Sequence, residues 1–83
     1  MRRKEFVDYG MQNANAAVVI EVIPVDIHED RFYDVIFYYE TDPKKTPHTC
    51  RLGPEAVPLD IKQGMRVRVK AILSTILGLE SIG

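Results

Sequence analysis

The sequence predicts a small, mostly β barrel domain, and three observations lead to that prediction. Apolar and basic residues alternate from Met65 to Leu73, which separates them on the two faces of a strand but would scatter both around a helix. The segments 17–28 and 31–40 are rich in β-branched and aromatic residues, which strands favour. A chain of 83 residues has room for one hydrophobic core, so we expect these strands to share it.

Residues 1–16 have the weakest pattern in the chain. Apolar residues at helical spacing compete there with a glycine and with asparagines, which weaken helices. We therefore expect an N-terminal arm or a short helix over 1–16, followed by a single barrel domain over 17–83. The arm is too apolar to be left in water, and we expect it to pack on the barrel or on a second copy. Its large apolar residues include Phe6, Tyr9 and Met11.

The first predicted strand, 17–28, is long for so small a domain and contains Pro24. Twelve extended residues span about 40 Å, and a proline cannot donate to a strand ladder, so we expect a bend or bulge near Pro24. The apolar residues change parity at that point. A bulge there would turn both sets toward the core: Val18, Ile20 and Val22 before the proline, and Val25 and Ile27 after it.

The second predicted strand, 31–40, is apolar on both faces. One face is continuous and is expected to form the core: Tyr33, Val35, Phe37 and Tyr39. The other face carries Asp34 and Glu40 but also Phe32, Ile36 and Tyr38, although one face of an antiparallel sheet is commonly solvated and polar. We expect the N-terminal arm or a partner to cover that second face.

The remaining elements are shorter. Asp42 followed by proline is typical of a type I turn, and we place the third strand at 48–52. Pro54 suits the first position of one helical turn over 53–57. The strand from Met65 to Leu73 then follows, and a last strand over 76–82 is expected to bend at Gly78.

This order of elements, three strands, a helical turn and two strands, resembles the OB-fold, a five-stranded Greek-key barrel. The resemblance covers residues 17–82 and depends on element order and on the glycine-preceded strand from Met65, with no family motif. An SH3-like barrel is the alternative that the same order allows. The OB resemblance implies a binding surface across the second and third strands, where Phe32, Tyr38 and Arg51 lie.

Two binding functions compete on this surface. Aromatic and basic side chains together can hold single-stranded nucleic acid, because bases stack and cations neutralise phosphates. The residues for this role are Phe32, Tyr38, Arg51, Arg66, Arg68 and Lys70. In the alternative, the cations form a solvated face and pair with Asp34 and Glu40 across strands. Self-association, which we favour, would use Phe6, Tyr9, Met11, Phe32, Ile36 and Tyr38.

Composition favours a non-catalytic, cytoplasmic interaction module. The formal net charge is -1, which gives no general attraction for nucleic acid or anionic lipid. Cys50 is the single cysteine and is expected to be a small buried hydrophobe, so neither a disulfide framework nor a cysteine-rich metal site is expected. No catalytic or cofactor-binding motif is present, so we expect no enzyme activity, no cofactor and no metal. We also expect no membrane insertion and no signal peptide. The expected partners are further copies of the chain or another protein.

Overall fold

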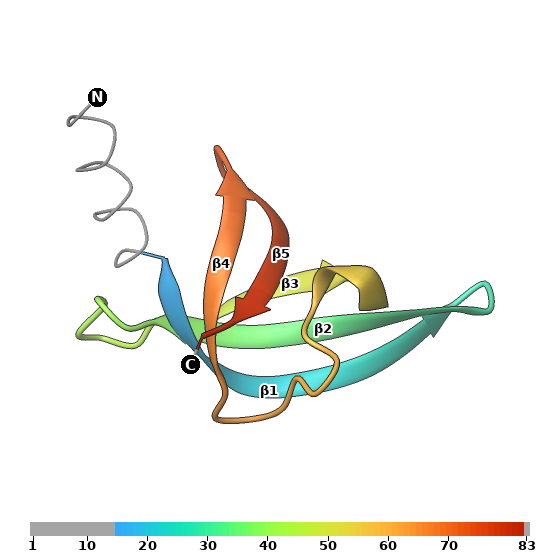
Figure 1. Cartoon of the computed structure of the whole chain (residues 1–83), viewed down its shortest axis with the longest axis horizontal. Coiled ribbons are helices and arrows are strands. Elements are labelled where there is room, and N and C mark those ends of the chain that lie inside the picture. Colours follow the sequence, from blue (N-terminus) through green and yellow to red (C-terminus); the bar gives the residue numbers. More distant parts are fainter. Residues whose placement is uncertain (1–14, 83) are drawn as a thin grey trace.

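The structure, a computed structural model, describes residues 15–82 and contains five strands and one short 3-10 turn (Figure 1). The strands are β1 (Ala16–Ile27), β2 (Asp30–Tyr39), β3 (His48–Leu52), β4 (Arg66–Ile72) and β5 (Thr75–Ser81). The turn, η1 (Pro54–Ala56), lies between β3 and β4. The predicted mostly β class, the five strands and the helical turn after the third strand are therefore confirmed.

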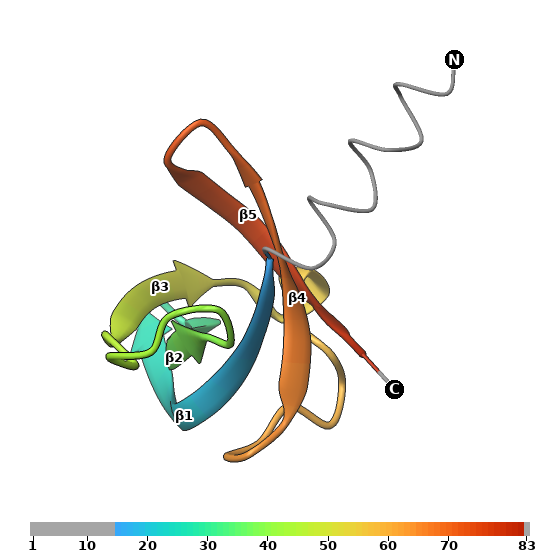
Figure 2. The same ribbon diagram turned by 90° about the vertical axis from the view of Figure 1, so that its left-hand side faces the viewer.

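The strands form one antiparallel sheet in the order β3-β2-β1-β4-β5, with β1 at its centre. The sheet curls so that its two edge strands, β3 and β5, lie close to one another (Figure 2). Within residues 15–82, no strand ladder joins these two edges. The sheet is thus strongly curled, and side chains rather than a strand ladder fill the gap between β3 and β5. We call this gap the seam.

The connections follow from local turn chemistry. The Asp42 carboxylate accepts hydrogen bonds from the backbone N–H groups of Lys44 and Thr46, at 2.9 and 3.0 Å. The Lys45 N–H also donates to the Asp42 carbonyl at 3.1 Å, which closes the predicted turn between β2 and β3. In η1, Pro54 occupies the first turn, where its missing N–H costs nothing.

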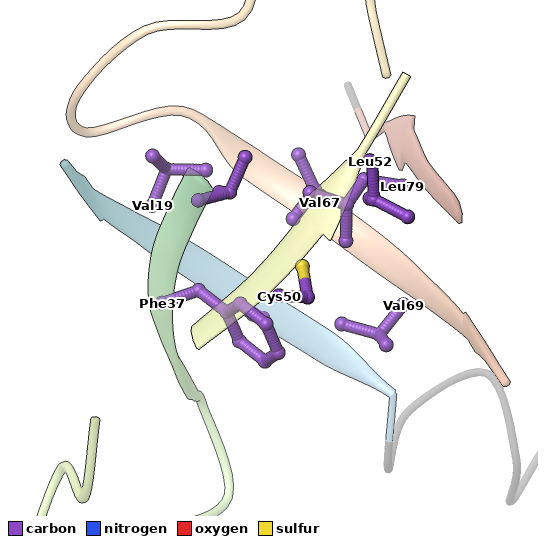
Figure 3. Packing of buried hydrophobic residues seen from close by; sticks show 9 residues of the cluster. Val19, Phe37, Cys50, Leu52, Val67, Val69 and Leu79 are labelled. Carbon is purple, nitrogen blue, oxygen red and sulfur yellow. The ribbon is translucent and has the colours of Figure 1, made fainter. Parts of the chain in front are cut away.

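The core lies inside the curl, between the β1–β2–β3 part of the sheet and the β4–β5 hairpin (Figure 3). Val35 and Phe37 are fully buried, and Tyr33 and Tyr39 pack against the core, so the predicted core face of the second strand is confirmed. Cys50 is buried, as expected for a small hydrophobe. The cluster consists of Ala17, Val19, Val35, Phe37, Cys50, Leu52, Val67, Val69 and Leu79.

The prediction for the first strand is wrong in one respect, the position of its bulge. The register of β1 against β2 shifts between Val19 and Glu21, and Pro24 stays paired with Tyr33. The residues of the early part of β1 that face the core are therefore Ala17 and Val19 rather than Val18 and Ile20. The proline is tolerated without a bulge because β4 pairs with β1 only over 16–18, which leaves β1 an edge strand at Pro24.

Candidate interaction surface

The outer face of the β1–β2 hairpin is largely apolar, although Glu21 and Asp34 also lie on it, opposite Ile36 and Ile23. Antiparallel pairing places Val25 opposite Phe32 and Val18 opposite Tyr38, with the side chains of each pair on the same side of the sheet. We call this surface the hairpin face. Its apolar members are Val18, Ile20, Ile23, Val25, Ile27, Phe32, Ile36 and Tyr38.

The hairpin face points away from the core. None of its members belongs to the core cluster or to the partly buried residues packed against it within residues 15–82. Ile23 is 39% exposed, and the other members are half-buried. A cluster of this kind on the outside of a small domain is the sort of apolar patch that commonly marks an interaction site.

Two ion pairs lie on or beside the hairpin face. On its β3 side, the Arg51 guanidinium donates to both carboxylate oxygens of Asp34, at 2.7 and 2.9 Å. At the β4 side, the Arg66 guanidinium makes the same two-bonded contact with Glu40. The Lys45 ammonium lies 5.5 Å from the centre of the Tyr38 ring, which allows a cation–π contact. The surface is therefore mostly apolar, with the paired Asp34 inside its β2 row and the Arg66–Glu40 pair at its β4 side.

The cations assigned to phosphate binding already have carboxylate partners. Arg51 and Arg66 are paired as described, and Arg68 and Lys70 share Glu80 at 3.4 and 3.3 Å. The pairing of Glu40 with this basic row is the alternative that the sequence suggested, whereas Asp34 pairs with β3 instead.

The two aromatic residues of the nucleic-acid hypothesis do not form one stacking platform. Phe32 and Tyr38 are both on the hairpin face but lie six positions apart in β2, about 20 Å along the strand. Together with the paired cations, this spacing gives the nucleic-acid role no support from the geometry, and it stays a prediction.

The Asp34–Arg51 pair leads to a prediction for the pH dependence of stability. The hydrogen bonds from Arg51 lower the pKa of the Asp34 carboxyl below its ordinary value of 3.8. The stabilisation from the pair is therefore complete above pH 3.8 and is lost as the pH falls through the lower folded-state pKa. We expect Asp34→Asn to be less stable than the wild type at neutral pH, with a gap in urea midpoint that closes in acid. The control Asp60→Asn, in the exposed loop before β4, should show little gap at any pH. A gap for Asp34→Asn that persists in strong acid would contradict the assignment.

Sequence reasoning identified the β2 half of the hairpin face and missed the β1 half. Phe32, Ile36 and Tyr38 lie on it, as predicted. All its β1 members except Ile23 were expected to face the core, because the bulge was placed too late in the strand; these are Val18, Ile20, Val25 and Ile27. Glu21, the one charged residue in the early apolar run, marks the true bulge and was the available signal. The predicted arm residues Phe6, Tyr9 and Met11 lie outside the described residues.

Cys50, the thiol of the described core, is not an activated nucleophile. Burial raises the pKa of the Cys50 thiol to about 11, so the thiol is protonated near neutral pH. His48, two residues away, stacks on Phe37 with 5.6 Å between ring centres. In the part of the chain from 15 to 82, no group of three or more His, Cys, Asp or Glu side chains is placed to hold a metal ion.

Comparison with known proteins gives no relative whose function could be transferred to this chain. Among the described residues, no helix has the length and apolar character needed to cross a membrane. No protein-family model, curated protein or solved structure matches the chain.

Proposed function

We propose that this protein is a non-catalytic interaction module that self-associates through the hairpin face. The observation that carries the proposal is the apolar outer surface of β1 and β2, which lies on the side of the sheet opposite the core. Each strand contributes a row of aliphatic or aromatic side chains, so two copies can bring the same patch together around a twofold axis. The order of strands and the place of η1 support an OB-like barrel as its scaffold.

The charges of the hairpin face favour a second copy over an unrelated partner. The Asp34 carboxylate on this face is already joined to Arg51, and Glu40 at its β4 side is joined to Arg66. A surface whose charges are balanced in this way does not repel a copy of itself. A strongly basic or acidic surface would do so, and would instead select a partner of opposite charge. Cytoplasmic location remains part of this proposal.

The test is the molar mass in solution, measured by sedimentation equilibrium from about 1 µM to 1 mM. We expect the wild type to approach twice its 9.5 kDa chain mass or more as the concentration rises. In Ile23→Lys, a charge replaces the most exposed apolar side chain of the hairpin face, and association should weaken by about tenfold or more. Ile23 is suitable because its side chain is already exposed in the single chain, so the substitution should change the free energy of unfolding little.

The matched control is Leu59→Lys, which introduces the same charge at a fully exposed leucine outside the hairpin face. This variant should associate as the wild type does, and far-ultraviolet circular dichroism should show that both variants fold. A wild type that stays at 9.5 kDa at every concentration would refute the proposal. Equal weakening by both lysine variants would place the contact elsewhere.

A further inference from the structure

The tip of the β4–β5 hairpin exposes two large aliphatic side chains. Ile72 pairs with Thr75, so the loop between the strands consists of Leu73 and Ser74 alone. Leu73 is 98% exposed and Ile72 is 62% exposed. In Figures 1 and 2, this tip projects away from the β1–β2 hairpin, so it is separate from the hairpin face.

Neither the turn nor the core explains a leucine at this position. Leu73 has a φ of 57°, a left-handed conformation in which its Cβ crowds the backbone. Two-residue hairpin loops favour Gly, Asn or Asp at such a position. The backbone of Leu73 is therefore strained, and its side chain is not buried by any of the described residues. This combination of strain and exposure is what we expect of a side chain that contacts another body.

Positive charge lies just behind the tip. Strand alternation puts Arg68 and Lys70 on the same face of β4 as Ile72. Both cations share the single carboxylate of Glu80, at 3.4 and 3.3 Å, so among residues 15–82 this group has an excess of one positive charge. Lys70 is two residues from Ile72, about 7 Å along the strand.

The shape of the tip selects the kind of partner. A stable protein interface needs roughly 800 Å² from each side, which a convex two-residue loop cannot supply. A lipid surface needs no complementary shape, and shallow apolar elements enter its interface by about 5–10 Å. At that depth the 7 Å spacing would bring Lys70 to the level of the lipid headgroups.

We propose that the β4–β5 tip attaches the protein to an anionic lipid surface. Ile72 and Leu73 enter the boundary between headgroups and acyl chains, while Lys70 and Arg68 face the negative headgroups. This is contact with one leaflet, made by the tip of the hairpin. The proposal does not depend on self-association through the hairpin face, because the two surfaces share no residue.

The test is co-sedimentation of the full chain with vesicles of phosphatidylcholine, alone or mixed with phosphatidylserine. We expect binding to the mixed vesicles that weakens as salt is added. Leu73→Asn, which suits the turn and removes the apolar side chain, should lower the partition coefficient by about tenfold. Leu59→Asn removes an equally exposed leucine elsewhere and should bind like the wild type. Lys70→Gln should weaken binding to the mixed vesicles by about fivefold and leave pure phosphatidylcholine unaffected.

The same measurements can overturn the proposal. If the wild type fails to sediment with mixed vesicles at low salt, the tip is not a lipid contact. If Leu73→Asn and Leu59→Asn lose binding equally, general surface hydrophobicity accounts for it. If Leu73→Asn instead lowers the molar mass of the protein in solution and vesicles bind nothing, the tip contacts protein.

Discussion

Replacing Phe37 with alanine is expected to lower the free energy of unfolding by about 3–5 kcal/mol, enough to leave a large fraction of this small domain unfolded. Phe37 is fully buried at the middle of the core. Its ring lies edge-on to Tyr39, with 5.3 Å between centres, and stacks on His48. Alanine would remove both contacts and leave a cavity that the curled sheet cannot fill.

The matched control is Phe32→Ala, the same substitution in the same strand but on the hairpin face. We expect a loss of only about 1 kcal/mol there, because the ring is half-buried and the space opens to solvent. Urea denaturation followed by circular dichroism measures both, at a protein concentration low enough to keep single chains predominant. Equal losses for the two variants would mean that Phe32 is buried as deeply as Phe37, so that the hairpin face is not the exposed face of the sheet.

The contrast between these two phenylalanines shows what the sequence could predict. Alternation within 31–40 separated Phe37 from Phe32 correctly, because residue spacing fixes the two faces of a strand. Alternation alone cannot say where a strand changes register. In β1 the change is fixed by Val19, whose N–H donates to Met65 and whose carbonyl accepts from Gly64, 2.9 and 2.8 Å away. Those partners are far away in sequence, so apolar alternation could not place the bulge, and the charge of Glu21 was the one local sign of it.

The same limit applies to the candidate interaction surface. The sequence singled out Phe32, Ile36 and Tyr38 because they are apolar where an outer face is usually polar. It could not assign Arg51 to Asp34, because that pairing depends on the register between β2 and β3. It also could not show that Leu73 lies at the tip of a turn, since the alternation continues through Leu73 while β4 ends at Ile72.

Replacing Gly78 with valine is expected to destabilise the protein by about 2 kcal/mol, although valine is a much better strand former than glycine. Gly78 lies in β5 beside η1, and a Cβ built there would approach the Ala56 carbonyl oxygen to 3.0 Å. The two further carbons of valine would push η1 away from the strand. Because η1 lies near the seam between β3 and β5, this displacement would loosen the contact that holds the curled sheet together.

Gly64→Ala separates this crowding from the ordinary cost of replacing a glycine. Gly64 has a φ of +87°, but a Cβ there would meet no atom within 4 Å. Alanine should therefore cost only the backbone term, about 1 kcal/mol. Urea midpoints of both variants, compared with the wild type, measure the difference. If Gly78→Val were as stable as the wild type, strand propensity would outweigh the contact. In that case η1 could not be seated on β5, and the seam would have to be held by the side chains of β3 and β5 alone.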